Sequence, residues 1–267
     1  MSDDLQRRWI SSMAEAYDRW LVPTVFRPFA DDLAARVVAF DPARILEVAA
    51  GSGAVTSAMV ALAPSAEIVA TDLSPAMVEF GAAAVPQALW RRADALSLPF
   101  VDGEFDVVVC QFGVMFFPDR VAALREMGRV TTPDGRMIYS VWETADRHDF
   151  ARALQAGLQR AFPDDLPKFV AAIPHGYSDV AVIAADVVAA GLDIVAFDTI
   201  DLVGHAASAE DIALGFCLGT PVRGEIESRG SLADTIDIVA DEIRSQLGTE
   251  AISGRMTAHV IEVRSAH

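Results

Sequence analysis

The chain has 267 residues, of which 52% are hydrophobic, so it can bury a full core, and this excludes global disorder. Its formal net charge of −17 opposes binding to nucleic-acid phosphates and to anionic membranes, so we expect no nucleic-acid partner. The N-terminal sequence has no apolar signal core, and no charge-free window reaches membrane-spanning length, which predicts a cytoplasmic protein without stable membrane insertion.

Two helices are predicted at the start of the chain. The first covers residues 5–21, because apolar side chains recur there at four-residue steps: Trp9, Met13, Tyr17 and Leu21. The second covers residues 26–40. The two cysteines, Cys110 and Cys217, are too far apart in the sequence to indicate a disulfide framework or a zinc site.

From residue 43 onward, short apolar runs alternate with helical segments. Strands are expected in the segments RILEVAA, AEIVATDL, ALWRRADAL, FDVVVCQFGV and, after a TPDG turn, RMIYSVW. Ser74 and Pro75 give a strong helix start, as N-cap and first helical residue. This alternation predicts a parallel α/β sheet, doubly wound, which binds its ligand at the carboxyl ends of the strands.

After Trp142 the pattern loosens. Helices are expected within residues 146–178 and 206–250, and a helix and a strand within 179–205; a last strand is expected within 251–265. We predict a single domain over residues 1–267. Its core would comprise residues of about 25–145, 179–205 and 251–265, and its cap the segments of about 1–24, 146–178 and 206–250.

The stretch LEVAAGSGAVT places an acid at the end of a buried strand, directly before a glycine loop. Gly51 and Gly53 fit the first two positions of a dinucleotide fingerprint, but Thr56 occupies the third, and no G-K-S/T follows. Glu47 would also repel a pyrophosphate. The loop is therefore better suited to a ligand that carries positive charge.

Two further acids follow the next two strands. Asp72 can accept hydrogen bonds from a ribose diol, and Asp94, followed by the small Ala95, can bind an exocyclic amine beside a flat ring. An adenosine bearing a cationic group satisfies all of these positions. S-adenosylmethionine, with its sulfonium and its α-ammonium, is such a molecule.

Four segments in this order resemble the motifs of a known family: LEVAAGSG, TDLSPAMV, RRADALSLPF and FDVVVCQFGVMFFPD. The chain resembles the class I S-adenosylmethionine-dependent methyltransferases, and is similar to the small-molecule enzymes of ubiquinone and menaquinone biosynthesis (methyltransferase type 11). The resemblance covers about residues 43–142. It implies a mostly parallel seven-stranded Rossmann-like sheet with N-terminal helices and late helical cap insertions.

One residue departs from the family pattern. The first glycine of the family's E-x-G-x-G-x-G is Ala49 here, so we expect the loop to avoid a positive φ at that residue. The resemblance implies a cofactor-binding set of Tyr17, Glu47, Ala49, Gly51, Gly53, Asp72, Leu73, Met77, Asp94, Ala95, Gln111 and Phe112. Met115, Phe116 and Trp142 are predicted to line the substrate pocket.

The reaction expected is methyl transfer to a small, partly hydrophobic acceptor through an O, N or C atom, with S-adenosylhomocysteine as product. His148 is the weak candidate for a base, but His148, His175 and His205 are more typical of surface or loop histidines. No metal-ligand spacing is present. The partners expected are a small molecule and, as an option, a second copy in a homodimer.

Two alternatives stay open from the sequence. A nicotinamide-dependent oxidoreductase would share the strand, glycine loop and acid, although Thr56 and Glu47 disfavour it. A non-catalytic module that binds S-adenosylmethionine would keep the same cofactor residues and have no turnover.

Overall fold

The computed structural model describes residues 12–266, so the predicted position of Trp9 lies outside the described residues. The chain divides into two compact units, each built from segments that are far apart in the sequence. One unit comprises Met1–Pro28, Glu143–Gly176 and Asp201–Thr257, and the other comprises Phe29–Trp142, Tyr177–Ile200 and Ala258–His267. The predicted division into a core and a cap stays a prediction.

A seven-stranded sheet forms the second unit, and β6 and β7 extend beyond it. In chain order the strands are β1 (Arg44–Val48), β2 (Glu67–Asp72), β3 (Leu89–Arg92), β4 (Phe105–Gln111), β5 (Thr131–Trp142), β6 (Leu192–Ala206) and β7 (Ile252–Ser265). Their order across the sheet is β3-β2-β1-β4-β5-β7-β6. The first five pair in parallel, and β7 pairs antiparallel to β5, which confirms the predicted doubly wound α/β class.

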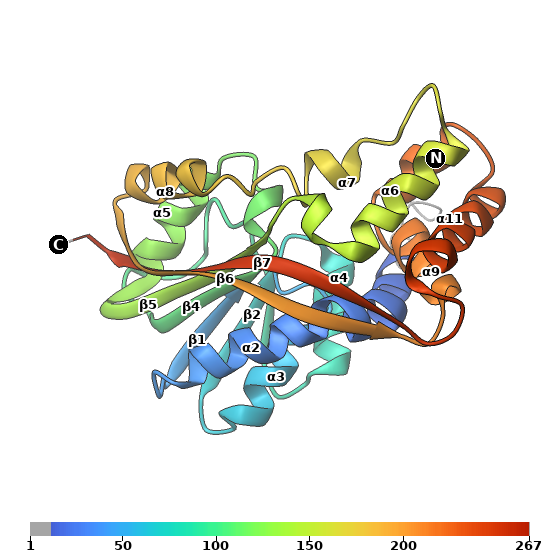
Figure 1. The fold of residues 1–267 in the computed structure, drawn as a ribbon. Helices are drawn as coiled ribbons and strands as arrows, with labels where there is room; N and C mark the ends of the chain where they lie inside the picture. The colour runs from blue at the N-terminus through green and yellow to red at the C-terminus, as the bar shows by residue number, and fades with distance from the viewer. Residues whose placement is uncertain (1–11, 267) are drawn as a thin grey trace. The chain divides into compact units, whose positions relative to one another are not determined.

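Helices cover both faces of this sheet. They are α2 (Arg27–Val38), α3 (Ala54–Leu62), α4 (Pro75–Ala84), α5 (Arg120–Val130) and α8 (Val180–Ala189). Figure 1 shows α5 and α8 on one side of the sheet and α2 and α3 on the other. On the α2 and α3 side, aliphatic side chains from both helices pack on those of β1, β2 and β4 in one buried core. That core fixes the strand ends from which the site is built.

Local signals set the element ends in this unit. The predicted start of α4 is confirmed, because the Ser74 hydroxyl accepts a hydrogen bond from the Met77 backbone N–H and Pro75 is the first helical residue. The predicted TPDG turn falls inside β5. There the pairing with β4 jumps from Phe105–Thr131 to Val107–Arg136, so the turn residues bulge out of the ladder.

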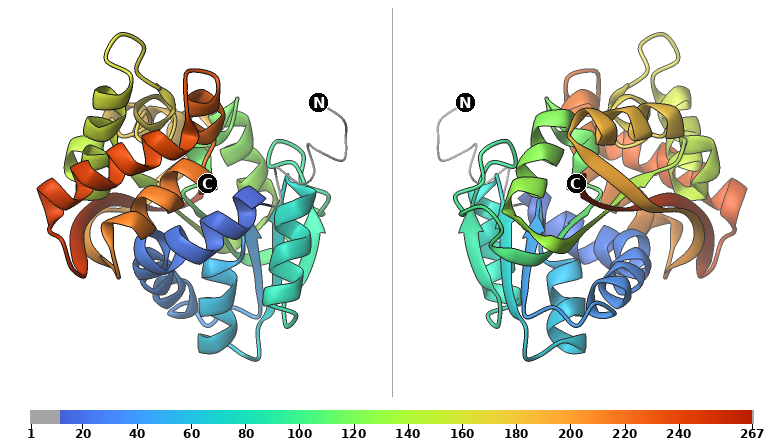
Figure 2. Two further views of the ribbon diagram at one scale, coloured as in Figure 1. Left: turned by 90° about the vertical axis from the view of Figure 1, so that its right-hand side faces the viewer. Right: turned by 90° about the vertical axis from the view of Figure 1, so that its left-hand side faces the viewer.

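The other unit is mostly helical. It contains η1 (Tyr17–Phe26), η3 (Ala145–Arg147), α6 (Asp149–Ala161), α7 (Phe169–Ala172), α9 (Ala209–Gly219), α10 (Val222–Glu227) and α11 (Leu232–Leu247). Figure 2 shows α11 alongside α6 and α9, and it contacts both. The segment η1 is a π-helix with Pro23 inside it, where sequence periodicity predicted an ordinary amphipathic helix. Within residues 12–266, no helix is both long and apolar enough to cross a membrane.

Candidate functional site

The loop between β1 and α3 has an unusual backbone. Ala49, Gly51 and Gly53 all have positive φ, at 56°, 58° and 94°. A Cβ added at Gly51 would meet no atom within 4 Å, so this glycine is required for its φ, and the space beside it is open. At Gly53 an added Cβ would lie 3.0 Å from the Trp90 ring. The loop therefore leaves open space beside the Gly51 backbone, at the carboxyl end of β1.

The expectation for Ala49 is wrong. A φ of 56° places this alanine in the left-handed region, which costs an L-residue about 1–2 kcal/mol. Its methyl group packs toward the loop after β4, because a Cβ added at Gly113 would lie 2.7 Å from Ala49 Cβ. The loop thus has a left-handed backbone at a residue that is less suited to it than glycine.

Glu47 lies behind this loop and is 2% exposed. Its Oε2 accepts a hydrogen bond of 2.5 Å from the Thr56 hydroxyl, in the first turn of α3. Burial raises the pKa of Glu47 to about 8, and the charge of Asp72 adds to the rise, whereas the bonds from Thr56 oppose it. The carboxyl therefore keeps its proton at neutral pH unless a cation stabilises its charge.

Asp72, at the end of β2, ties the glycine loop to the neighbouring strand. One carboxylate oxygen accepts from Gly51 N at 2.9 Å, and the other accepts from Ser74 N at 2.8 Å. Burial raises the pKa of Asp72, and these backbone bonds oppose the rise. After Asp72, Leu73 is 59% exposed and Met77 is half-buried, so both apolar side chains keep surface available beside the acid.

Asp94 follows β3 by two residues. Its carboxylate accepts a hydrogen bond of 3.0 Å from Leu96 N and otherwise faces solvent, while Ala95 is buried. The strand order places the ends of β3, β2, β1 and β4 side by side. The predicted acids and the glycine loop therefore lie along one edge of the sheet, where the strand order reverses between β1 and β4.

An aromatic cluster closes the ends of β4 and β5. The Phe112 ring stacks on Trp142 with centroids 3.7 Å apart, and Phe29 of α2 packs edge-on against Trp142 at 4.9 Å. Phe112 has a φ of 52°, and its N–H donates to the Ser140 carbonyl at 3.0 Å. Gln111, the last residue of β4, is half-buried directly before it.

The three predicted substrate-pocket residues have different environments. Met115 and Trp142 are buried, whereas Phe116 is 50% exposed on the short helix η2 (Val114–Phe116). Trp142 packs against both Phe112 and Phe29. If it forms a pocket wall, as predicted, it does so as part of this cluster. The roles of all three toward a substrate stay predictions.

Sequence reasoning missed three hydroxyl groups at this edge. Thr56 is the partner of Glu47, where the sequence showed only a missing glycine. The hydroxyls of Ser52, in the loop, and Ser140, near the end of β5, are buried and have no hydrogen-bond partner among the described residues. The position of Ser52 between two glycines of the loop was the sequence feature that could have predicted its hydroxyl as part of the site.

The candidate base His148 has a structural role. It and His175 lie in connecting segments, as the expectation of surface or loop positions allows, but both are buried, so neither is a surface histidine. His148 Nδ1 accepts from Ala151 N and caps α6, which places the proton of the neutral ring on Nε2. His175 Nδ1 donates to the Glu143 carbonyl at 2.7 Å. Burial lowers the pKa of both rings, and His175 lowers the pKa of His148 further.

Two other predictions concern metals and Tyr17. Among residues 12–266, no group of three or more His, Cys, Asp or Glu side chains could hold a metal ion. Tyr17 begins η1 in the helical unit, where its ring lies 4.8 Å from that of Phe26. Its predicted contact with a cofactor stays a prediction.

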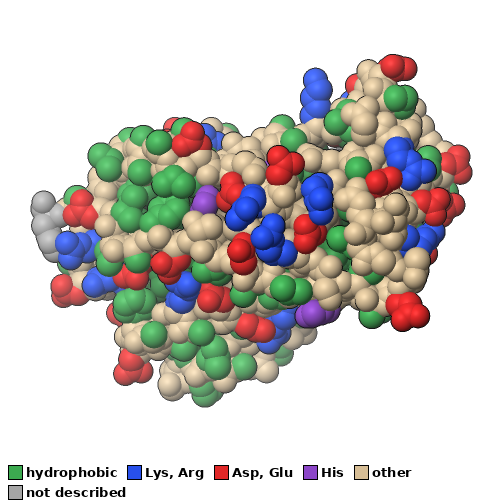
Figure 3. Space-filling view, in the orientation of Figure 1, with side chains coloured by type: hydrophobic (Ala, Val, Ile, Leu, Met, Phe, Trp, Pro, Cys, Tyr) green, Lys and Arg blue, Asp and Glu red, His purple; other side chains and the backbone are tan. Residues whose placement is uncertain are grey.

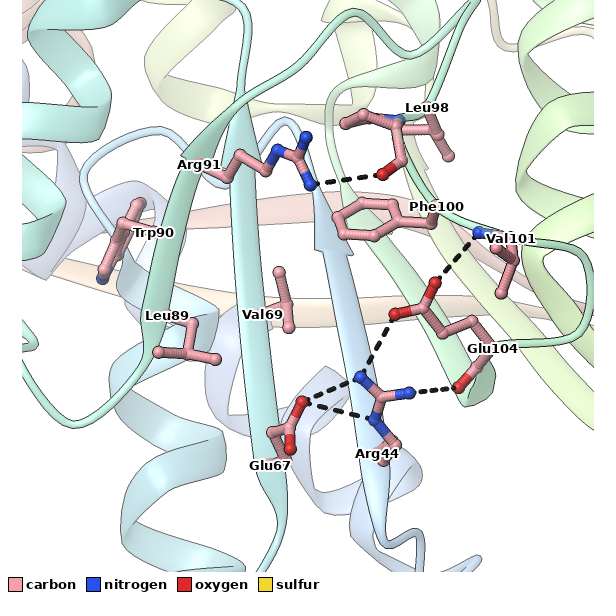
Figure 4. Close-up of a pocket in the computed structure, with 11 residues that line it drawn as sticks. Arg44, Glu67, Val69, Leu89, Trp90, Arg91, Leu98, Phe100, Val101 and Glu104 are labelled. Atoms are coloured by element: carbon pink, nitrogen blue, oxygen red, sulfur yellow. Dashed lines mark hydrogen bonds and ion pairs between the residues drawn. The ribbon is translucent and has the colours of Figure 1, made fainter.

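A separate hollow of about 610 Å³ extends along β1, β2 and β3, from Arg44 and Glu67 at the amino ends of β1 and β2 to Arg91 near the end of β3 (Figure 4). Arg44 and Glu67, the first residues of β1 and β2, pair there at 2.9 Å, and Arg44 also pairs with Glu104 at 3.2 Å. The Arg91 guanidinium donates to the Pro99 carbonyl. The lining residues are Arg44, Glu67, Val69, Leu89, Trp90, Arg91, Leu98, Pro99, Phe100, Val101 and Glu104. Three of its charged groups, Arg44, Glu67 and Glu104, therefore form ion pairs, and Arg91 binds a backbone carbonyl.

Comparisons with known proteins agree with this geometry. The sequence model of a family described as a methyltransferase domain matches residues 46–139. A demethylmenaquinone methyltransferase of Deinococcus radiodurans is 38% identical over 135 residues, which are 48% of this chain and 56% of that protein. One of Mycolicibacterium vanbaalenii is 38% identical over 159 residues, 55% of this chain and 67% of that protein.

The same fold occurs in a solved structure. The YcgJ protein of Bacillus subtilis is 21% identical and superposes with a TM-score of 0.57, over 90% of this chain and 99% of that one. The chain spans little more than half the length of the Deinococcus relative, and the family model matches residues within the sheet unit.

Proposed function

Because the chain belongs to the class I S-adenosylmethionine-dependent methyltransferases, we propose that it transfers a methyl group from S-adenosylmethionine to a small, partly hydrophobic acceptor. The observation that carries this proposal is the left-handed loop of residues 49–53, tied through Gly51 to the carboxylate of Asp72. The product left on the enzyme is S-adenosylhomocysteine.

The residues at this edge suit the cofactor's groups. Asp72 keeps acceptor positions beyond its two backbone bonds, since a carboxylate offers about four, so it can also accept from the ribose hydroxyls. The buried Ser52 hydroxyl gains a partner when a polar ligand group lies against the loop. Asp94 and Ala95 would read the adenine edge, and Leu73 and Met77 would pack on its ring.

Glu47 would stabilise the cofactor's positive charge from behind the loop. A carboxyl with a pKa of about 8 is held in its neutral form by burial, and a nearby cation shifts it to the charged form. The cofactor, when bound, supplies an activated methyl group on its sulfonium. The protein therefore has to align the acceptor and exclude water, which the cluster of Phe112, Trp142 and Phe29 supports.

We propose that the acceptor is an aromatic compound whose acceptor atom loses its proton readily, as a phenol oxygen or an activated ring carbon does. His148 is engaged as a helix cap, so no dedicated base is assigned, and an acidic phenol or a stabilised carbanion needs little base catalysis. Both curated relatives are named for demethylmenaquinone, which makes a quinol-type ring with an apolar substituent the first acceptor to test.

The experiment has two stages. Thermal unfolding is first followed with S-adenosylhomocysteine and, separately, with NAD⁺ and NADH. Stabilisation by S-adenosylhomocysteine alone supports the proposal, and stabilisation by the dinucleotides alone would reassign the site to an oxidoreductase. Transfer of a labelled methyl group from S-adenosylmethionine to quinol-type aromatics is then measured. Binding without turnover on these aromatics or on a metabolite extract would make the chain a non-catalytic binding module.

A further inference from the structure

Helix α8 (Val180–Ala189) is more apolar than its burial within the chain requires. Nine of its ten residues are alanine, valine or isoleucine, yet only Ile183 and Val187 are buried. Val180 is 49% exposed, Val182 is 43% exposed, and Val188 is 70% exposed. A helix that is apolar on all sides is normally covered on all sides. The outer face of α8 therefore lacks a partner within the described chain.

The apolar surface continues onto β6. Side chains two residues apart share a face of a strand, and Phe197 and Thr199 both contact His259, whose Nε2 lies 3.2 Å from the Ser178 carbonyl just before α8. Val195, on the same face, is 46% exposed. Figure 3 shows hydrophobic side chains gathered over α8 and the first part of β6.

We call this surface the α8 patch, and none of its members is charged. It comprises Val180, Ala181, Val182, Ala185, Val188, Ala189 and Val195. The two ends of the helix beside it carry opposite charges. Asp179 caps the start, where it accepts from Ala181 N at 2.8 Å. Arg125 of α5 is exposed at the other end and donates to the Ala189 carbonyl at 2.9 Å.

We propose that the α8 patch is the interface of a homodimer in which two copies of α8 pack antiparallel about a two-fold axis. In that arrangement the start of each α8, with Asp179, lies beside the end of the partner's α8, with the partner's Arg125. The charges therefore complement each other at both ends of the helix pair. It centres on Ala185, which faces its own copy. Val182 then faces the partner's Val188, and Ala181 faces the partner's Ala189.

The charges of the chain favour a second copy over a membrane surface. A net charge of −17 repels anionic lipids, and of the cations at the helix, Arg120 pairs with Asp186 and Arg125 donates to the Ala189 carbonyl. An interface that is uncharged between its two ends lets two strongly acidic copies meet, and added salt screens the repulsion between their net charges. A ten-residue helix is only about 15 Å long, so β6 has to contribute area through Val195 to approach the roughly 800 Å² per partner of stable interfaces.

Sedimentation velocity tests the proposal with two matched variants. Val188→Lys puts a charge into the α8 patch, and Val101→Lys does the same at a valine of nearly equal exposure, 70% against 69%, in the separate hollow. The wild type and Val101→Lys should sediment at twice 28.6 kDa, and Val188→Lys at 28.6 kDa. A monomeric wild type, or a dimeric Val188→Lys, would overturn the proposal.

Two further measurements distinguish a membrane from a second copy at the α8 patch, and test the antiparallel pairing. If the wild type is monomeric but co-sediments with vesicles of anionic phospholipid, and Val188→Lys does not, the patch docks on a membrane and the dimer proposal is wrong. In the dimer, Ala185→Cys should form an intermolecular disulfide on mild oxidation. Ala181→Cys should not, because its two copies lie about 12 Å apart along the axis, beyond disulfide reach. Equal crosslinking of both variants would contradict the antiparallel pairing.

Discussion

Charged residues have different environments at the two ends of the sheet. In the hollow at the amino ends, Arg44 pairs with Glu67 and Glu104, and these groups are partly exposed. At the carboxyl edge, Glu47 and Asp72 are neighbouring acids without a cationic partner among the described side chains, both with raised pKa, beside a loop with left-handed residues. The amino ends are satisfied without a ligand. Backbone strain and buried acids of raised pKa are typical of functional sites, which supports the proposal that the cofactor binds at the carboxyl edge.

The largest expected effect contrasts the two ends of β2. Asp72→Ala removes the tether of the glycine loop and an acceptor for the ligand, whereas Glu67→Ala removes an exposed ion pair at the other end of the same strand. A bond to a charged group is worth about 1.5–3 kcal/mol, so Asp72→Ala should weaken S-adenosylhomocysteine binding by about 10- to 100-fold. Calorimetric titration should show Glu67→Ala within about twofold of the wild type. Equal losses in both variants would remove the distinction between the ends.

The next effect tests how tightly the loops after β1 and β4 pack. Gly113→Ala adds a methyl group 2.6 Å from Cys110 Sγ and 2.7 Å from Ala49 Cβ. Overpacking of this kind should lower the free energy of unfolding by about 1–3 kcal/mol in urea titrations. Gly224→Ala, where an added Cβ meets no atom within 4 Å, is the control and should leave stability unchanged or slightly raised. A neutral Gly113→Ala would mean that these loops are not in contact.

Glu47 should give stability a pH dependence of its own. Its pKa is raised from 4.5 to about 8 on folding, so the unfolded chain loses this proton first, and stability falls as pH rises between those values. Glu47→Gln keeps an acceptor for Thr56 but cannot titrate. Its free energy of unfolding, measured by urea titration, should gain on that of the wild type from pH 5 to pH 8, by more than the roughly 1.4 kcal/mol of one pKa unit. Parallel curves for the two proteins would show that the acid is not buried.

The smallest effect concerns strain in the loop. Ala49→Gly relieves a left-handed alanine and should raise the unfolding free energy by up to about 1 kcal/mol. Ala50→Gly, at the next residue, relieves no positive φ and should lower it by about 0.5–1 kcal/mol through added freedom of the unfolded chain. Opposite signs for neighbouring residues, measured by chemical denaturation, are the expected outcome. Destabilisation by both variants would contradict the strain at Ala49.

The sheet and the line of acids at its edge could be predicted from the sequence, because local signals set them. Alternation of strands and helices determines the winding, and Ser74 with Pro75 determines where α4 begins. The φ of Ala49 could not be predicted, because it is imposed by the anchoring of the loop at both ends. The bond of Thr56 to Glu47 and the burial of His148 depend on tertiary packing, which a single sequence does not show.

Hydrogen exchange read out by mass spectrometry can locate the ligand along the chain. Exchange of the wild type is measured with and without saturating S-adenosylhomocysteine. Two sets of peptides are compared: those that cover the loop between β1 and α3 and the end of β2, and those that cover residues 98–104 in the hollow. We expect slower exchange across Gly51 to Ala54 and after Asp72, with residues 98–104 unchanged. Protection in the hollow without protection of the glycine loop would contradict the assignment of the carboxyl edge as the cofactor site.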